Sequence, residues 1–541
     1  MKRKVLAGIM AAVLSLSLFT GCGKDDGETG SNQESSGAQE SSGEESSDGQ
    51  SQGEEESGEQ QSQAGDEAQD SSGEWTGEVS KVIMVFPTGG VEPTDLGKVL
   101  EAINEISIKE VGVEVEFKPV SIFDLGSAAT RWIGGGEQID LLPVAFTPME
   151  PFITQNMIQP LDQWKDLAPD VWAKAEEAPI FDINFTGNVY GLAPTAPNGM
   201  QGTGGGYLIA KDDLEAAKLD YEDGQIITLD DLDTIFAAIK EAKPDVLPCG
   251  VIGSMDRAGF TFISDPLGAS ANSGVVMGLD STKVVNVYAS EEYKTYLEHV
   301  RSWYEKGYTL KDAATTDTSL DDLVASGGMS GYFSDCTMGL KIQLEQRTGR
   351  EFVRLMFQEP YIIAQTGSMG SFMTIPVTSK NPEGAMRFLN LMYKDSRIVN
   401  LLLWGIEDVH YVMVDREQNI IALPEGVDTT NNPYAYGLGL FGNQDDAYSM
   451  GSSTKEADEA WTEIALGRRT KGYGFCYDAS KMTDKITAID AVIQEYVPAL
   501  TTGSADLEST YANFIEKLEA NGINELVADK QAQFDAWLAQ Q

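Results

Sequence analysis

The hydrophobic pattern from residue 81 to residue 144 predicts strands that alternate with helices. Short apolar runs and strict apolar–charged alternation, as in VEVEF, have the period of a strand, whereas Leu96, Val99, Leu100 and Ile103 recur at helical spacing. The expected elements are strands at 81–86, 113–117 and 139–144 and helices at 94–106, capped by Thr94 or Asp95, and at 122–133. The order β-α-β-α-β implies right-handed crossovers and a parallel sheet. We therefore predict an α/β fold.

The carboxyl ends of these strands are the first candidate site. In open parallel sheets, ligands bind beyond the carboxyl ends of the strands. This rule selects Phe86 and Thr88 after the first strand and Phe146 and Thr147 after the third.

The pattern changes after residue 188, which predicts a passage between two bodies. The segment NVYGLAP is followed by five residues, 202–206, that are nearly all glycine, and a new strand is expected at 207–210. A helix with Leu232, Ile235, Phe236 and Ile239 on one face follows. We interpret residues 192–205 as a crossing from one lobe to another.

The segment 25–74 cannot form a core. It contains sixteen acidic residues and no Lys or Arg, and its apolar residues are three alanines. Such a composition cannot bury enough apolar surface to offset the chain entropy, so we expect a disordered acidic leash that holds a folded body away from its anchor.

The N-terminus has the pattern of a secretory signal. Three basic residues precede an apolar run at 5–19 that is too short to span a bilayer, and Gly21 stands before Cys22. The sequence LFTGC resembles the lipobox of bacterial lipoproteins, although Phe19 stands where leucine is usual. The resemblance implies cleavage before Cys22 and attachment of lipid to its thiol. The alternative is an ordinary signal peptide with an incidental cysteine.

Charge and cysteine content narrow the class of partner. From Trp75 onward 69 acidic residues oppose 34 basic ones, a net charge of −35, which argues against nucleic acid or anionic lipid as a partner. It favours a neutral or cationic ligand, although a local basic pocket could still take an anion.

After Cys22 only Cys249, Cys336 and Cys476 remain, an odd and widely spaced set that we interpret as three buried thiols.

Enzyme motifs are largely missing. GLGLFG at 437–442 has the letters of GxGxxG, but neither a strand nor an apolar helix is expected beside it, and no Walker sequence occurs. With two histidines, His299 and His410, and no HExxH, a metal or His-based catalytic centre is not expected. Among 85 acidic residues, carboxylate pairs carry no information, so a two-carboxylate glycosidase stays an alternative.

Several segments, taken in order, resemble a known family. NVYGLAPTA, GYLIAKDDL, LVASGGMSGYFSDC and TIPVTSKNPEGAMRFLNLMYKD together look like a family 1 extracellular solute-binding protein of an ABC importer. The closing stretches, LLLWGIEDVHYV, GYGFCYD and ELVADKQAQFDAWL, resemble a Gram-positive subfamily with a shared C-terminal domain of unassigned role.

The resemblance implies a two-lobed, periplasmic-binding-protein-like α/β fold with a ligand cleft and several hinge crossings. The implied divisions are a signal peptide at 1–21, a linker at 22–78, lobe one at 79–192 with 372–470, and lobe two at 193–371 with 471–541. In this family a solute lies between the lobes.

Aromatic and polar residues near glycine-rich turns complete the candidate site, because sugar faces stack on aromatic rings while Asp, Asn, Ser and Thr bind hydroxyls. Tyr207 follows the crossing, Phe333, Ser334 and Asp335 follow a glycine-rich turn, and Trp404 precedes an acidic pair. The full set of candidate ligand-binding residues is Phe86, Thr88, Phe146, Thr147, Asn198, Tyr207, Phe333, Ser334, Asp335 and Trp404. The alternative for each aromatic residue is a place in a core.

These observations predict a monomeric, lipid-anchored binding protein on the outer face of the cell membrane. It would deliver a solute, a sugar or oligosaccharide, to an ABC permease by hinge closure, with no chemistry, cofactor or metal. The alternatives are a surface-anchored glycan-degrading enzyme and a glycan-holding adhesin, and a peptide ligand stays open.

Overall fold

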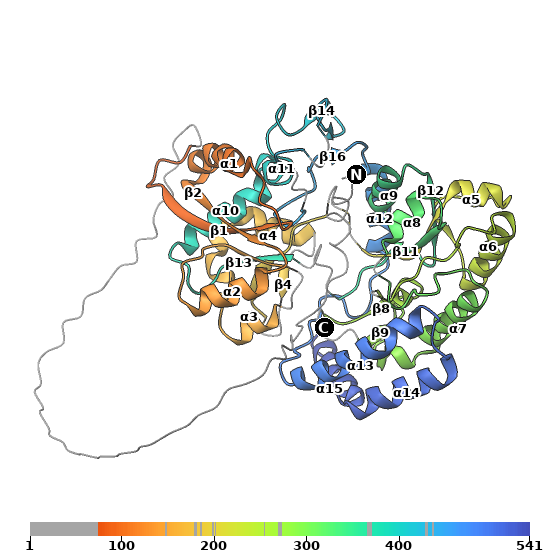
Figure 1. Ribbon diagram of the computed structural model, residues 1–541. Helices are drawn as coiled ribbons and strands as arrows, with labels where there is room; N and C mark the ends of the chain where they lie inside the picture. Colours follow the sequence, from red (N-terminus) through yellow and green to blue (C-terminus); the bar gives the residue numbers. More distant parts are fainter. Residues whose placement is uncertain are drawn as a thin grey trace, which may run out of the picture.

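The protein has two lobes that lie side by side (Figure 1). The computed structural model describes residues 74–145, 149–177, 181–183, 187–196, 200, 202–253, 255–268, 273–316, 318–364, 371–427, 431–434 and 438–541. The predicted signal peptide, Cys22 and the leash up to residue 73 lie outside the described residues. None of the described helices is long and apolar enough to cross a membrane.

Lobe one is built from two separated stretches of chain. Its first stretch contains β1 Ser80–Thr88, α1 Leu96–Val111, β2 Val113–Ser121, α2 Leu125–Gly134, β3 Leu142–Ala145, α3 Glu150–Thr154, η1 Asp162–Leu167, α4 Pro169–Glu177, β4 Phe181–Ile183 and β5 Val189–Leu192. Its second stretch contains β13 Ser371–Thr374, α10 Pro382–Lys394, α11 Ser396–Trp404, β14 Val412–Asp415 and β15 Ile420–Ala422, followed by β16 Ser449–Met450.

The sheet of lobe one confirms the predicted β-α-β-α-β unit and adds a strand from far along the chain. β1 and β2 are parallel, from the pair Ser80–Val113 to the pair Thr88–Ser121, and a parallel bridge joins Met84 to Leu141 beside β3. β13 then lies antiparallel between β3 and β5, which makes the sheet mixed. The two expected helices begin and end within three residues of their predicted bounds at most ends, but α1 continues to Val111, where Gly112 caps it in the left-handed conformation.

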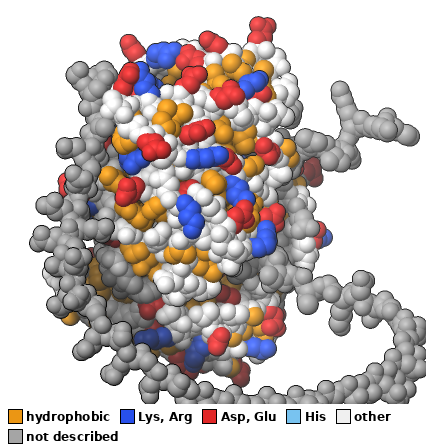
Figure 2. Space-filling model, turned by 90° about the vertical axis from the view of Figure 1, so that its left-hand side faces the viewer, with side chains coloured by type: hydrophobic (Ala, Val, Ile, Leu, Met, Phe, Trp, Pro, Cys, Tyr) orange, Lys and Arg blue, Asp and Glu red, His pale blue; other side chains and the backbone are white. Residues whose placement is uncertain are grey.

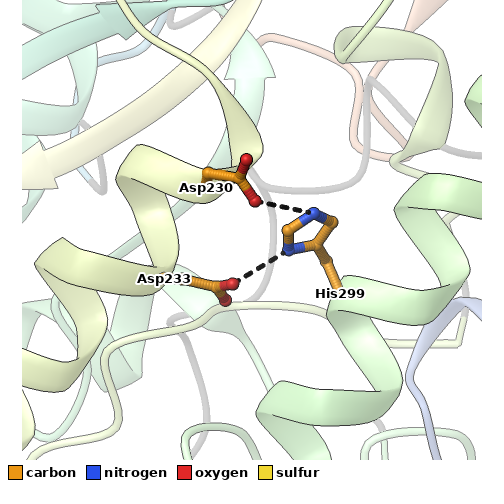
Figure 3. A group of neighbouring side chains, drawn as sticks. All are labelled: Asp230, Asp233 and His299. Carbon is orange, nitrogen blue, oxygen red and sulfur yellow. Dashed lines mark ion pairs between the residues drawn. The ribbon is translucent and has the colours of Figure 1, made fainter.

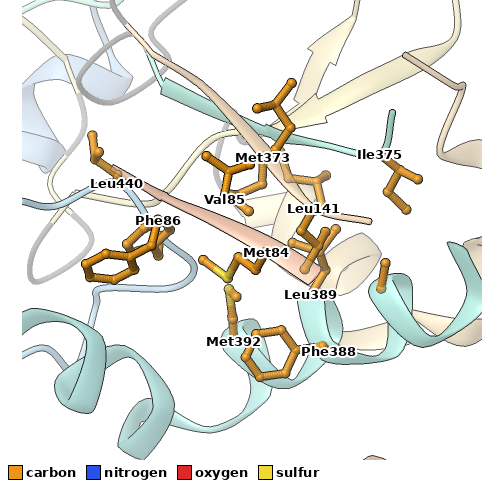
Figure 4. Packing of buried hydrophobic residues seen from close by; sticks show 14 of the residues in the cluster. Met84, Val85, Phe86, Leu141, Met373, Ile375, Phe388, Leu389, Met392 and Leu440 are labelled. Atoms are coloured by element: carbon orange, nitrogen blue, oxygen red, sulfur yellow. The ribbon is translucent and has the colours of Figure 1, made fainter. Parts of the chain in front are cut away.

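The core of lobe one packs β1 against α10. Figure 4 shows Met84, Val85 and Phe86 of β1 beside Phe388, Leu389 and Met392 of α10, all of them with no exposed surface. Asn381 caps α10 and Pro382 begins it, a favoured helix start. Since α10 begins 190 residues after β5 ends, lobe one is complete only when the chain has returned from lobe two.

Lobe two lies between and after these stretches. Its strands are β6 Gly205–Ala210, β7 Gln225–Ile226, β8 Ser264–Asp265, β9 Gly274–Met277, β10 Val284–Asn286, β11 Gly331–Asp335 and β12 Phe352–Met356. Its helices are α5 Lys211–Ala216, α6 Leu229–Ala242, η3 Ala258–Phe260, η4 Val287–Ala289, α7 Glu291–Glu305, α8 Leu320–Ala325, α9 Met338–Thr348, α12 Lys455–Leu466, α13 Thr483–Thr501, α14 Leu507–Ala520 and α15 Ile523–Leu538.

The main sheet of lobe two has the order β11-β6-β12-β7. β6 is antiparallel to both neighbours, and Leu247 and Gly250 form parallel bridges to Met329 and Tyr332 along the outer side of β11. The short stretch before residue 251 therefore runs in the same direction as β11, and both end at the edge where β6 begins.

The C-terminal helices α13, α14 and α15 form the outer layer of lobe two. α15 packs on β9 and β10, and α13 packs on α7. Lys530 of α15 is fully buried and donates hydrogen bonds to the carbonyls of Pro266 (2.9 Å) and Gly274 (2.8 Å). Its ammonium also lies 4.9 Å from the centre of the Tyr477 ring.

The two cores locate the division between the lobes. The lobe-one core extends to Ala447, whereas Trp461 of α12 packs with Leu208, Phe352 and Met356 of lobe two. The sequence-based division at residue 470 assigns α12 to lobe one, but in the structure its buried face lies against lobe two. The chain thus passes between the cores near residues 193–205, 357–371 and 448–454.

Candidate functional site

The candidate site lies between two sheet edges that the crossings bring together. In lobe one the parallel strands β1 and β2 end at Thr88 and Ser121. In lobe two β11 ends at Asp335, which pairs with Gly205, the first residue of β6 after the first crossing. By the rule for α/β sheets, these strand ends are the candidate ligand-binding edges.

The first crossing is bonded at both of its ends. On the lobe-one side Thr195 is 4% exposed; its hydroxyl donates to Asn443 Oδ1 (3.0 Å) and accepts from the Gln444 N–H (2.7 Å). On the lobe-two side Thr203 and Tyr361 exchange backbone hydrogen bonds of 2.8 and 2.9 Å. The first crossing is therefore tied to residues 443–444 of lobe one at one end and to the second crossing at the other.

The glycine run after the crossing is explained by close packing. A Cβ on Gly202 would lie 2.5 Å from the Ala465 side chain, and one on Gly204 would lie 2.9 Å from the Trp461 ring. A Cβ on Gly205 would lie 2.0 Å from the carbonyl oxygen of Phe260. Because glycine has no side chain, these residues can pass between α12 and η3, where a Cβ atom would clash.

Asp265 joins the second crossing to the segment that leads into the C-terminal helices. Its buried carboxylate accepts hydrogen bonds from the N–H groups of Leu267 (2.8 Å) and Ala364 (2.9 Å) and from the Thr470 hydroxyl. Burial raises the pKa of Asp265, while these hydrogen bonds and the charge of Lys530 oppose the rise.

Three of the aromatic candidates lie in the lobe cores. Tyr207 and Phe333 have no exposed surface; their rings meet edge to face at 4.9 Å, and the Tyr207 hydroxyl lies within hydrogen-bond distance of the Pro248 (2.7 Å) and Gly331 (2.6 Å) carbonyl oxygens. Phe86 is also unexposed and lies 4.7 Å from the Phe117 ring and 6.0 Å from the Phe441 ring. These three rings therefore lie in a hydrophobic core, the alternative given for each aromatic residue in the sequence analysis, and they pack behind the sheet edges.

The polar candidates lie at the edges themselves. Thr88 is 4% exposed and donates to the Val120 carbonyl, and Ser334 is half-buried near the end of β11. The Asp335 carboxylate accepts from the Gly204 N–H (2.9 Å) and the Thr203 hydroxyl (3.4 Å), so it holds the first crossing. Burial raises the pKa of Asp335 to about 6 against these hydrogen bonds, which lower it. Phe146, Thr147 and Asn198 lie outside the described residues.

Trp404 ends α11 at a strained turn. It is half-buried against the lobe-one core, and its indole N–H is buried without a hydrogen-bond partner. Gly405 follows with φ +78°, and a Cβ there would lie 2.4 Å from Nδ1 of His410. That Nδ1 accepts from the Ile406 N–H at 2.8 Å, so the other ring nitrogen, Nε2, carries the proton and faces Asp95 at 3.2 Å. His410 thus ties this turn to the residues that follow β1.

The sequence analysis missed Arg257, which lies at the same edge of lobe two. One of its terminal nitrogens donates to the carbonyl of Phe333, and the guanidinium lies 5.6 Å from the Tyr332 ring centre. Arg257 is 8% exposed. The only signal available in the sequence was a charged pair, Asp256 and Arg257, between apolar stretches.

The group Asp230, Asp233 and His299 is the one cluster with metal-ligand spacing among the described residues. Figure 3 shows the imidazole between the two carboxylates, with Nε2 3.6 Å from Asp230 and Nδ1 3.3 Å from Asp233. The Trp303 indole N–H also donates to Asp233. A metal ion would occupy one nitrogen with both carboxylates on that side, whereas here each nitrogen faces a different carboxylate. The cluster therefore joins α6 to α7 as an ion-paired contact.

Two recesses lie away from the candidate edges. One, of about 460 Å³, is lined by residues of β9, β10 and the start of α7, and the other, of about 580 Å³, lies beside Trp172 of α4. The outer face of lobe one carries interspersed acidic and basic side chains, without a large field of one sign (Figure 2). We place the candidate site at the crossings because, among the described residues, strands of both lobes end beside them.

The fold defines a class: two α/β lobes joined by three crossings, the architecture of the extracellular solute-binding proteins of ABC importers. A structure of the N-glycan transport solute-binding protein NgtS from Streptococcus pneumoniae matches with a TM-score of 0.72 at 21% identity, covering 86% of this chain and 99% of that one. An extracellular solute-binding protein from Bifidobacterium longum subsp. infantis matches with a TM-score of 0.62 at 14% identity, covering 87% and 100%. The predicted fold class is confirmed.

The sequence comparisons agree with this class. A carbohydrate ABC transporter substrate-binding protein of Streptococcus pneumoniae is 24% identical over 478 residues, which cover 84% of this chain and 91% of the relative. The family model for a domain of unknown function, DUF3502, matches residues 471–539. The resemblance found in the sequence, including its separate C-terminal domain, is therefore confirmed, and the structure shows that this domain contains α13, α14 and α15.

Proposed function

We propose that this protein is the carbohydrate-binding component of an ABC importer and that it captures an oligosaccharide between its lobes. The observation that carries the proposal is that two sheet edges, one in each lobe, are joined by crossings that are bonded at Thr195, Thr203 and Asp335. The relatives support the choice of ligand, since one is described as a carbohydrate substrate-binding protein and NgtS structures are described as complexes with Man1GlcNAc and Man5GlcNAc.

Hinge closure is the proposed mechanism. Hydroxyl and carbonyl groups at both edges contact the ligand at once, so binding energy is gained only when the lobes approach, and the permease recognises the closed form. No bond is made or broken, and no cofactor takes part. Among the sequence-predicted candidates, Thr88, Phe146, Thr147, Asn198 and Ser334 are the proposed ligand contacts at the edges, while Phe86, Tyr207 and Phe333 hold those edges in shape.

A thermal-shift screen followed by calorimetry tests the proposal. The soluble body, residues 74–541, is mixed with mannose–N-acetylglucosamine oligosaccharides, fructooligosaccharides, uronides and peptides. A ligand that binds only the folded state raises the melting temperature, by an amount that grows with its concentration over Kd. A response to oligosaccharides without release of shortened products supports the proposal, whereas product release identifies the glycan-degrading alternative and a response to peptides alone contradicts the ligand class.

We further propose that Cys22 carries a lipid that holds the protein on the outer face of the cell membrane, as a monomer. The support is the lipobox-like LFTGC sequence and the acidic segment 25–74 after it. Replacing Cys22 with Ser should abolish labelling by a fatty-acid probe and release the protein or leave it uncleaved. Continued labelling would contradict the anchor.

A further inference from the structure

Arg257 is a buried cation without an acidic partner in the described part of the chain. It is 8% exposed, and no carboxylate of the described residues lies within ion-pair distance of it. One terminal nitrogen donates to the Phe333 carbonyl, while Nε is buried with no hydrogen-bond partner. Burying a charge costs several kcal/mol unless hydrogen bonds and an opposite charge compensate it. Among the described residues this compensation is incomplete.

The nearest acidic groups are engaged elsewhere. The Asp256 carboxylate accepts from the Tyr293 hydroxyl and the Ala258 N–H, both at 3.0 Å. The Asp321 carboxylate accepts from the Tyr332 hydroxyl at 2.6 Å and pairs with Arg347. The Arg257 guanidinium is therefore left with aromatic neighbours and a backbone carbonyl, and desolvation lowers its pKa.

The position of Arg257 is at the edge of lobe two that meets the crossings. It bonds to Phe333, two residues before β11 ends at Asp335. Three residues after Arg257, the Phe260 carbonyl accepts from the Gln358 side chain and lies against Gly205 at the start of β6. The loop that carries Arg257 thus adjoins both the first and the second crossing.

A second polar atom near this point also has no partner. The Tyr296 ring lies 5.7 Å from the Phe333 ring, and its fully buried hydroxyl has no hydrogen-bond partner in the structure. By contrast, Arg350 at the opposite end of the same sheet is similarly buried but bonds to Asp212 and Asp213. Arg350 is therefore paired with two carboxylates, whereas the hydrogen bonding of the Arg257 guanidinium is incomplete.

We propose that Arg257 binds the carboxylate of an acidic sugar residue, such as a uronic or sialic acid, within the oligosaccharide held between the lobes. This inference rests on the proposed function and names its ligand class. The planar guanidinium presents a fork of N–H donors that matches a carboxylate with two parallel hydrogen bonds, which a neutral hydroxyl cannot complete.

The experiment compares matched acidic and neutral sugars by calorimetry on residues 74–541: 3′-sialyllactose with lactose, and digalacturonic acid with galactobiose. The wild-type protein is expected to bind the acidic member of at least one pair tenfold or more tightly. Arg257→Gln should reduce that preference to threefold or less. Arg350→Gln is the matched control, which should lower the melting temperature but keep the preference.

The outcomes separate this inference from the proposed function. Equal binding of acidic and neutral members, or a preference that survives Arg257→Gln, overturns the role of Arg257 and leaves the binding function intact. Binding of no saccharide in this set or in the wider screen overturns both. If Arg257→Gln does not melt cooperatively, Arg257→Lys replaces it. Lysine keeps the positive charge but cannot form two parallel hydrogen bonds with a carboxylate, so the preference for the acidic sugar should fall at least threefold. An unchanged preference contradicts the proposal.

Discussion

Replacing Lys530 with Met tests the junction between the C-terminal domain and the rest of lobe two. Lys530 is fully buried on α15, and its ammonium bonds to the carbonyls of Pro266 and Gly274. Burial lowers the pKa of Lys530 from 10.5 to about 7, while the charge of Asp265 acts in the opposite direction. The unfolded chain therefore binds more protons at this residue than the folded protein between pH 7 and pH 10.

The sign and size of the effect follow from linkage. Where the unfolded state binds more protons, the free energy of unfolding rises with pH, by about 1.4 kcal/mol per pH unit for one proton. Below pH 7 the folded protein holds a buried charge at full cost. From pH 7 to pH 9 Lys530 becomes neutral only in the folded state, which should add about 2 kcal/mol of stability to the wild type.

Urea unfolding at pH 7 and pH 9 measures this directly. The Lys530→Met variant lacks the titration, so the stability of the wild type relative to the variant should increase by about 2 kcal/mol over this range. Lys485→Met is the control, because Lys485 is exposed and pairs with Glu525 at the surface. A difference between wild type and Lys530→Met that does not change with pH would refute the burial of a titrating lysine.

Three further changes test the crossings, the core and the N-terminal contact. Burial raises the Asp335 pKa to about 6, so below that pH the folded protein binds a proton more tightly than the unfolded chain does. As the pH rises from 4 to 7, the free energy of unfolding of the wild type should therefore fall by up to about 3 kcal/mol relative to that of Asp335→Asn. Parallel pH profiles of the two proteins in urea unfolding would contradict this. Phe333→Ala should lower the free energy of unfolding by about 3–5 kcal/mol in the ligand-free protein, whereas a large loss of affinity with an unchanged melting temperature would place the ring in the ligand site. Deleting residues 25–73 should leave the melting temperature unchanged, and a large shift would show that this segment packs on the folded body. Trp75→Ala, by contrast, should lower the melting temperature, because the Trp75 ring contacts Gly112 and lies 4.8 Å from the Arg387 guanidinium.

The elements of lobe one were predictable where the pattern is local. The apolar–charged alternation in β2 and the helical spacing of apolar residues in α1 show which face of each element is buried against elements nearby in the sequence. Both elements lie at their predicted positions. The glycine run likewise indicated the crossing, although the sequence could not show that Phe260 and Trp461 lie against it.

The site was less predictable, because its residues are defined by contacts across long separations. Phe333 stands beside a glycine-rich turn, as a ligand-stacking residue would, but it is buried because its ring packs against those of Tyr207, Tyr296 and Trp303. Arg257 carries no motif, and its importance arises only from what the fold leaves unpaired around it. The place of α12 in lobe two depends in the same way on the packing of Trp461 with Leu208, which lies 253 positions earlier.

The order of strands in lobe one also constrains how the protein is made. β13 pairs with β3 on one side and β5 on the other, so the centre of the sheet is filled by residues 371–374. A nascent chain that has passed β5 still exposes both unpaired strand edges until the whole of β6 to β12 has been synthesised. Lobe two in turn awaits α12 to α15. Neither lobe can therefore finish folding during early synthesis, and most of the chain must be made before either core is complete.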